Sequence, residues 1–211
     1  MTYIFETKLQ TWDEDLNITR KVQIPSTSTL AALGYLLLTV YGAQGYHLFD
    51  FTIGKTTYGC DEESSDKPVF GLTVEKAFAR TKTAVFSYDY GDGWTFDVKL
   101  VEKKEEESEA KLISGTGRGI VEDVGGTGGL ESFIEAFKEG KGEEYEEFCD
   151  WLGITQYDAD ICKVNRINEM LVESIASLAE AYESENGADD IERFKDWFED
   201  CFGVCYWSDE E

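Results

Sequence analysis

The sequence is poor in proline, histidine and basic residues, and it lacks a long apolar stretch. It contains 2 prolines, 1 histidine and 19 Lys and Arg among 211 residues. No run approaches the roughly 18 apolar residues that cross a membrane, and the N-terminal residues lack the basic and apolar parts of a signal peptide. We therefore expect a cytoplasmic protein without a membrane partner. Hydrophobic residues make up 42% of the chain, which is typical of a folded domain and not of a disordered chain.

Cysteine is present, but its pattern argues against the common cysteine-based sites. The five cysteines are an odd number and contain no Cys-x-x-Cys pair, which argues against a disulfide framework and against a four-cysteine zinc site. With a single histidine, neither a histidine-rich metal site nor a Cys–His catalytic pair is supported. Reduced thiols are the expectation.

Acidic residues outnumber basic residues by 44 to 19, which gives a formal net charge of −25. The imbalance is concentrated in residues 101–211, which hold 31 acidic and 10 basic residues. Such a surface repels a phosphate backbone, so we expect no direct contact with nucleic acid. The charge serves solubility, or it provides a docking face for a basic protein partner.

Hydrophobic periodicity predicts an α+β fold with a strand-strand-helix opening. Alternating apolar residues indicate about five strands in a mostly antiparallel sheet, and Gly42 is placed to end the first helix. The predicted strands are residues 3–9, 18–24, 46–53, 84–90 and 94–101, and the first helix covers residues 30–41.

The second half of the sequence is predominantly helical. After a charged segment at 102–111 and a glycine-rich stretch at 115–129, apolar residues recur at helical spacing. The predicted helices cover residues 130–139, 148–152, 164–182 and 191–198, and the last two are expected to form a helical hairpin through 185–187. This hairpin packs on the sheet or mediates an oligomer. We divide the chain into an α+β domain at 1–168 and a helical extension at 169–211.

Two carboxylates and three aromatic side chains meet in the turn segment from Tyr88 to Trp94. Asp89 and Asp92 in this turn are suited to bind a hard cation or to share acid and base roles. The alternative is structural, because Asp in a glycine-flanked turn caps its own backbone amides and alternate aromatic residues of a strand pack in the core.

The glycine-rich stretch does not fit a phosphate-binding loop. No Gly-Lys-Ser/Thr follows it, and Glu122 and Asp123 would repel a phosphate. These two acids instead accept hydrogen bonds from the turn at Gly125 and Gly126, or they join the two aspartates of the preceding turn in a four-carboxylate site for Mg²⁺ or Mn²⁺. The predicted metal ligands are Asp89, Asp92, Glu122 and Asp123.

His47 and Arg20 are the remaining candidates. On an ideal strand His47 shares a face with Phe49 and Phe51, which favours a hydrogen-bonded core residue over a ligand. Arg20 lies in register with apolar strand residues, so it either pairs with a carboxylate, with Asp89 or Asp92 as candidates, or extends to the sheet edge.

Four motifs follow one another in order along the chain. They are Val22-Gln23-Ile24-Pro25 with Thr29-Leu30, His47-Leu48-Phe49-Asp50-Phe51, the segment from Tyr88 to Trp94, and Glu122-Asp123-Val124-Gly125-Gly126. This ordered set resembles the plasmid pRiA4b ORF-3-like family. The resemblance covers about residues 3–168 and implies an α+β fold with no established biochemical activity to carry over.

This sequence departs from the family pattern mainly by losing histidines. Where the family commonly has histidine, this chain has Gly34, Phe49 and Phe96, and Thr19 replaces a tryptophan before Arg20. The loss of proton carriers at neutral pH lowers the expectation of catalysis. We therefore expect an interaction module that binds through Arg20, His47, Tyr88, Asp89, Asp92, Trp94, Glu122, Asp123, Gly125 and Gly126. The alternatives are a metal-assisted hydrolase or nuclease-like enzyme, and a regulator that reaches plasmid or mobile DNA through a protein partner.

Overall fold

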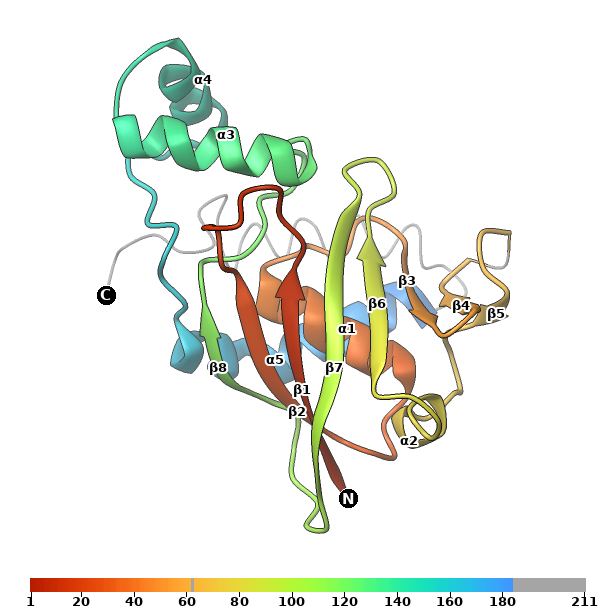
Figure 1. Cartoon of the computed structure of the whole chain (residues 1–211). Helices are drawn as coiled ribbons and strands as arrows, with labels where there is room; N and C mark the ends of the chain where they lie inside the picture. The colour runs from red at the N-terminus through yellow and green to blue at the C-terminus, as the bar shows by residue number, and fades with distance from the viewer. Residues whose placement is uncertain (62, 184–211) are drawn as a thin grey trace.

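The computed structural model describes residues 1–61 and 63–183, which form one large mixed sheet and five helices (Figure 1). The strands are β1 (Thr2–Leu9), β2 (Thr19–Pro25), β3 (Phe49–Ile53), β4 (Thr56–Gly59), β5 (Lys67–Pro68), β6 (Thr83–Tyr88), β7 (Trp94–Lys104) and β8 (Lys111–Thr116). The helices are α1 (Leu30–Tyr41), α2 (Val74–Ala77), α3 (Gly126–Glu139), α4 (Glu143–Leu152) and α5 (Val164–Glu183).

The described part of the sheet has eight strands in the order β5-β4-β3-β6-β7-β1-β2-β8. All neighbours are antiparallel except β4 and β5, which are parallel. The α+β class is therefore confirmed, but the prediction of about five strands was too low. The pattern missed β4 and β5 because they are very short, and it missed β8 because only Leu112 of this edge strand is buried.

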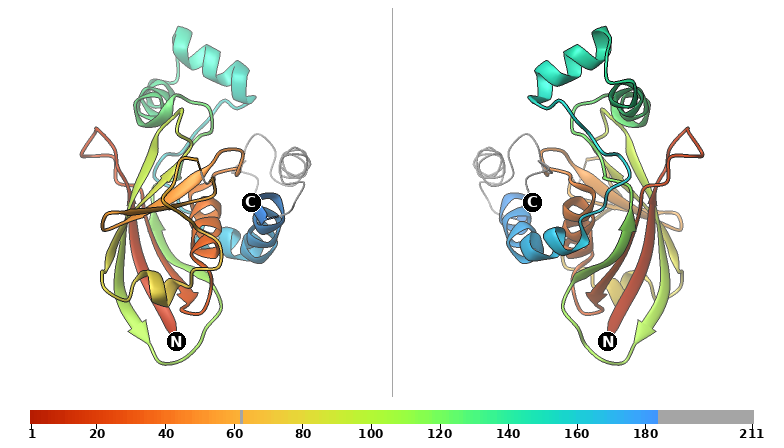
Figure 2. Two further views of the ribbon diagram at one scale, coloured as in Figure 1. Left: turned by 90° about the vertical axis from the view of Figure 1, so that its right-hand side faces the viewer. Right: turned by 90° about the vertical axis from the view of Figure 1, so that its left-hand side faces the viewer.

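Two helices cover one face of the sheet (Figure 2). Helix α1 begins after Thr29, whose side chain accepts the N–H of Ala32, and it ends at Gly42 in the left-handed conformation. Eleven of its twelve residues are buried, because α1 lies between the sheet and α5. The main core thus forms between α1 and the inner faces of the central strands.

Helix α5 also protects an edge of the sheet. The side chain of Asn168 accepts the N–H of Leu112 at 2.9 Å and donates to the carbonyl of the same residue at 2.8 Å. These bonds satisfy backbone groups of β8 that an unpaired edge strand would expose. The predicted domain boundary at residue 168 lies within α5, and the predicted helix at 191–198 and the turn at 185–187 lie outside the described residues.

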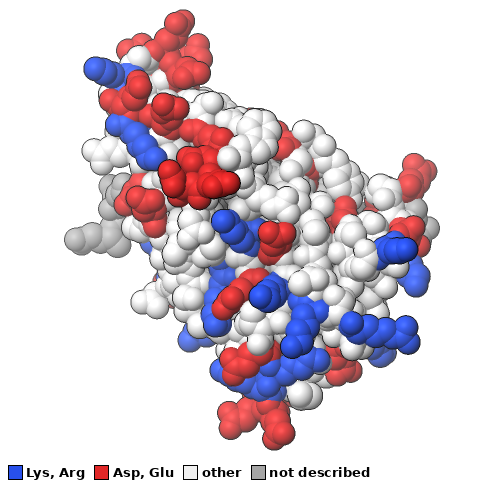
Figure 3. Space-filling view, in the orientation of Figure 1, with Lys and Arg blue, Asp and Glu red and all other residues white. Residues whose placement is uncertain are grey.

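The opposite face of the sheet is uncovered, and charge is unevenly distributed over it (Figure 3). Acidic side chains gather over α3 and α4 at one end, whereas basic side chains, mixed with acidic ones, gather over the lower part of the strands. Cross-strand pairs such as Lys21 and Glu6, 3.0 Å apart, keep this face solvated. Among the described residues, no helix has both the length and the apolar character needed to cross a membrane.

Candidate functional site

Three side chains that could ligate a metal converge where the chain leaves or enters the central strands. His47 precedes β3, Asp89 follows β6, and Glu122 lies between β8 and α3. One nitrogen or oxygen atom of each residue lies within 4.8 Å of the corresponding atoms of the other two. Asp89 and Glu122 are buried and His47 is partly exposed, so the cluster is closed on one side and open on the other.

Local backbone contacts orient Asp89. The residue has a left-handed conformation with φ of 53°, and its N–H donates to the carbonyl of Leu48. Its Oδ1 atom accepts the N–H of Gly91 at 2.9 Å. Aspartate tolerates this conformation because its short polar side chain bonds to the nearby backbone. The other oxygen, Oδ2, faces Nε2 of His47 at 3.5 Å.

Glu122 is buried and only half satisfied. Its Oε1 atom accepts two hydrogen bonds of 2.7 Å, from the N–H of Gln44 and from the hydroxyl of Tyr88. Its Oε2 atom is buried and has no hydrogen-bond partner among the described residues. Burial raises the pKa of Glu122 to about 7, the two hydrogen bonds oppose this rise, and the negative charges of Asp123 and Asp89 add to it.

His47 does not lie on a strand, contrary to the sequence prediction. The predicted strand at 46–53 begins only at Phe49, so His47 does not share the core face of Phe49 and Phe51. Its side chain is 35% exposed, and its Nε2 atom lies 3.9 Å from Oδ1 of Asp123 as well as near Asp89. The imidazole therefore points toward carboxylates and not into the apolar core.

The four predicted carboxylate ligands are separated by the fold. Asp89 and Glu122 join His47, whereas Asp123 is 70% exposed and lies on the open side of the cluster. Asp92 turns away, and its Oδ2 atom accepts the N–H of Gly125 at 3.3 Å. The three-residue cluster thus contains one nitrogen ligand that the predicted metal set omitted.

The glycine-rich segment allows close packing against the β6–β7 turn. Gly126 has a φ of 68°, and a Cβ atom at this position would lie 2.1 Å from the carbonyl oxygen of Asp92. Only glycine permits that approach without a shift of the backbone. The contact anchors the start of α3 on the turn, and this fixes the segment that carries Glu122 and Asp123.

Two of the predicted binding residues support the site from inside the protein. Tyr88 is fully buried, and its hydroxyl bonds to Glu122 and accepts the N–H of Gly45 at 3.2 Å. Trp94 pairs with Tyr88 across the hairpin and is also fully buried, so it belongs to the core and is closed to a ligand.

Arg20 lies elsewhere, and its side-chain hydrogen bonds within the described residues go to backbone carbonyls and not to a carboxylate. It is 1% exposed, and it donates to four backbone carbonyls, those of Val40, Thr19, Thr116 and Arg118, over distances of 2.6–2.8 Å. The expectation of a pair with Asp89 or Asp92 was wrong, and so was the alternative of an extended side chain at the sheet edge. Arg20 is a structural residue that joins α1 to the strands.

The cluster has the donor atoms of a divalent-metal site, one imidazole nitrogen and two carboxylates. Two ligand atoms that each lie about 2.0–2.2 Å from one ion are roughly 3.0–3.5 Å apart in octahedral or tetrahedral geometry. The 3.5 Å distance from His47 to Asp89 matches this range. A metal would also supply the partner that Oε2 of Glu122 lacks.

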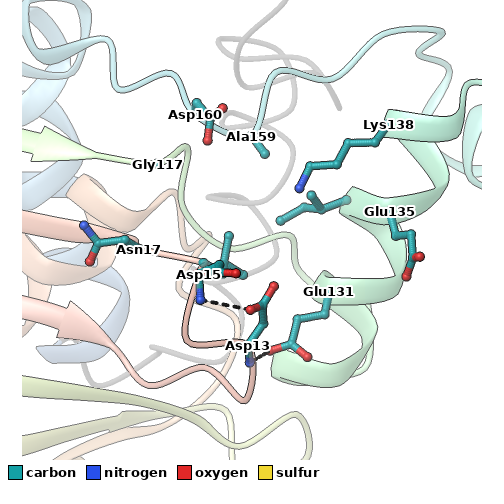
Figure 4. Close-up of a pocket in the computed structure, with 11 residues that line it drawn as sticks. Asp13, Asp15, Asn17, Gly117, Glu131, Glu135, Lys138, Ala159 and Asp160 are labelled. Atoms are coloured by element: carbon teal, nitrogen blue, oxygen red, sulfur yellow. Dashed lines mark hydrogen bonds between the residues drawn. The ribbon is translucent and has the colours of Figure 1, made fainter.

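A second acidic hollow lies between the β1–β2 turn, α3 and the segment at 159–160, with a volume of about 400 Å³ (Figure 4). Two of its carboxylates, those of Glu131 and Asp13, hold backbone amides. Oε1 of Glu131 accepts the N–H groups of Trp12 and Asp13, and Oδ1 of Asp13 accepts the N–H of Asp15. These bonds explain Glu131 and Asp13 as supports of the turn.

The sequence profile of the plasmid pRiA4b ORF-3-like proteins matches residues 2–166. The chain belongs to this family. The matched region contains His47, Asp89 and Glu122, and it ends near the start of α5.

Two relatives extend this comparison. The chain is 29% identical over 169 residues to the uncharacterized protein y4hQ of Sinorhizobium fredii, covering 77% of this chain and 87% of the relative. It is similar to the crystal structure of MM3350, a protein of unknown function from Methanosarcina mazei, with a TM-score of 0.68 and 24% identity. That likeness covers 78% of this chain and 96% of MM3350, and it shows the shared fold.

Proposed function

We propose that this family member is a divalent-metal-binding protein, and that His47, Asp89 and Glu122 bind the ion. The observation that carries the proposal is the buried Oε2 atom of Glu122, which has no hydrogen-bond partner among the described residues. Burying a polar atom without a partner is costly, so native proteins rarely retain one unless a ligand or a function compensates. The adjacent His47 and Asp89 are residues that bind metals, which identifies a cation as the compensating ligand.

The donor set favours a first-row transition metal over magnesium. Imidazole nitrogen suits Zn²⁺ and similar ions, whereas Mg²⁺ prefers an all-oxygen environment with several waters. We therefore expect Zn²⁺ to bind most tightly, Mn²⁺ less tightly and Mg²⁺ least. This ranking replaces the expectation of Mg²⁺ or Mn²⁺ that rested on carboxylates alone.

Metal-assisted hydrolysis is a second candidate function, favoured by the open side of the cluster. Three protein ligands leave a coordination position for water, as in catalytic metal sites. Asp123 lies on that side, 3.9 Å from His47, and if a metal were bound there this carboxylate would serve as a general base. The charges that act on Glu122 are those of Asp123 and Asp89, so the site favours neutral or cationic substrates over phosphate esters.

Calorimetric titration of the metal-free full chain with Zn²⁺, Mn²⁺ and Mg²⁺ tests the proposal. We expect one stoichiometric site, and we expect Asp89→Asn to weaken Zn²⁺ binding by at least about 100-fold. Asparagine also adopts the left-handed conformation and keeps the acceptor for Gly91, so this variant removes the charge with little change of the turn.

Asp92→Asn is the matched control, because it makes the same substitution in the same turn. Asp92 contacts Gly125 and not the cluster, so this variant should bind Zn²⁺ like the unmodified chain. Equal weakening in both variants would indicate diffuse attraction to an acidic surface. That result, or an unmodified chain without stoichiometric binding, would contradict the proposal.

A further inference from the structure

The loop that carries His47 is held from two sides. It connects α1 to β3, and on the cluster side the N–H groups of Gln44 and Gly45 donate to Glu122 and Tyr88. On the other side, the hydroxyl of Tyr182 in α5 donates a hydrogen bond to the backbone carbonyl of His47. The residue that presents the imidazole is therefore fixed by a helix 135 positions further along the chain.

The ring of Tyr182 is itself held in place by aromatic neighbours. It stacks on Tyr35 with ring centroids 5.6 Å apart and an angle of 24° between the planes. It also contacts the ring of Phe49 edge-on, with centroids 5.1 Å apart. Because Tyr35 lies in α1 and Phe49 in β3, the hydroxyl of Tyr182 has a defined position relative to the elements on both ends of the His47 loop.

Close packing of α5 against the same loop supports this assignment. A Cβ atom at Gly45 would lie 2.3 Å from Cδ2 of Leu178, one turn before Tyr182 in α5. Gly45 also has a φ of 79°, which favours glycine. The loop is thus shaped to fit against the helix.

We propose that Tyr182 is a positioning residue of the metal centre, which orients His47 through its backbone carbonyl. The inference rests on the proposed metal site. Most of α5 lies beyond residue 166, where the family match ends, so a segment outside the matched region completes the centre. Partners in the layer behind a metal ligand set its orientation, and their loss typically weakens metal binding by about 10–100-fold.

The test compares Tyr182→Phe with Tyr35→Phe in the full chain. Both substitutions remove one hydroxyl from the same stacked pair and keep both rings. The hydroxyl of Tyr35 bonds to Glu183 at 3.0 Å and, within the described residues, makes no hydrogen bond to the His47 loop, so Tyr35→Phe is the control. Circular dichroism and thermal unfolding of the metal-free variants report whether each is folded.

Two readouts separate positioning from a general structural role. Zn²⁺ affinity should fall about 10-fold or more in Tyr182→Phe and stay unchanged in Tyr35→Phe. The visible absorption spectrum of bound Co²⁺, which reports coordination geometry, should change only in Tyr182→Phe. The imidazole resonances of His47 are unambiguous because the chain has one histidine, and they should shift on metal binding in all folded variants that retain the site.

The outcomes distinguish the two proposals. Unchanged affinity and spectrum in Tyr182→Phe, with metal binding in the unmodified chain, would overturn the role of Tyr182 and leave the metal site in place. Equal weakening in both variants would overturn it as well, because packing of α5 in general would then be responsible. Absence of stoichiometric binding in the unmodified chain would overturn both proposals.

Discussion

Asp89 and Asp92 show how environment separates two identical residues within one turn. Asp89 is buried, and its free oxygen faces His47, whereas Asp92 bonds to the backbone of Gly125. Sequence spacing gave both the same prediction. The difference arises because only Asp89 directly follows β6, where the chain passes the His47 loop, so its side chain meets groups from two other segments.

The raised pKa of Glu122 predicts a pH-dependent stability for the metal-free protein. The pKa is about 7 in the folded state against an ordinary value of 4.5. Between pH 4.5 and pH 7 the carboxyl of Glu122 is therefore protonated in the folded state and ionised in the unfolded state. The free energy of unfolding therefore falls as pH rises from about 4.5 to about 7. Glu122 accounts for a loss of about 3 kcal/mol across this range.

Glu122→Gln isolates this contribution from the other carboxylates. The variant is neutral at every pH, so its advantage in unfolding free energy over the unmodified chain should grow by about 2.5 kcal/mol between pH 5 and pH 8. Urea denaturation of the metal-free proteins at these two pH values measures the difference. The same variant should lose Zn²⁺ binding. A constant difference at both pH values would show that Glu122 is ionised throughout.

At the scale of elements, the glycine-rich segment determines how α3 meets the sheet. The contact of Gly126 with the carbonyl of Asp92 places the segment at 122–125 beside the β6–β7 turn. The glycines of this segment thus serve close packing and not phosphate binding, because they let the backbone of α3 approach the backbone of the β6–β7 turn. The two acids of the segment reach the cluster as a result.

Gly126→Ala should therefore destabilise the protein more than a glycine replacement elsewhere. Gly54 is the control, because its φ of 66° is almost the same while the space around it is open. Each alanine incurs about 1–2 kcal/mol from the left-handed backbone, and Gly126→Ala adds the displacement of Asp92. Chemical denaturation should show an excess loss of about 1 kcal/mol or more in Gly126→Ala. Equal losses would mean that the contact adjusts freely.

At the scale of the whole molecule, the fold consists of a sheet with one helical face and one open face. Arg20 connects these layers, since its guanidinium bonds to a carbonyl of α1 and to carbonyls of β2, of β8 and of the following loop. The guanidinium carbon of Arg20 also lies over the ring of Tyr41, 4.9 Å from the ring centroid. A protein partner for the acidic end at α3 and α4, and the division of the chain at residue 168, stay predictions.

Arg20→Met should lower the free energy of unfolding by about 3 kcal/mol or more. Methionine fills a similar volume but leaves the carbonyls without donors, and buried acceptors that lose a partner each cost about 1–3 kcal/mol. Arg20→Lys should recover only part of the loss, because an ammonium group lacks the planar fork that reaches separate carbonyls. Urea denaturation measures both. A loss below about 1 kcal/mol in Arg20→Met would show that water replaces the guanidinium.

The sequence predicted those helices and strands that are encoded by residues close together in the chain. The opening hairpin, helix α1 with its end at Gly42, the β6–β7 hairpin and the long helix α5 all follow from periodicity, capping and turn residues. The strands β4 and β5 did not, because they are very short. The edge strand β8 did not, because only Leu112 is buried in it and its pairing with β2 joins distant parts of the chain.

The sequence by itself also determined the family, the acidic surface and most of the residues from which the site is built. Only the tertiary structure decided which of these residues meet. His47, Asp89 and Glu122 lie on three separate segments, and Tyr182 lies 135 positions from the histidine that it contacts. No local pattern encodes such distances. They follow from the packing of α1 and α5 on the sheet, which buries one oxygen of Glu122 and leaves it without a partner.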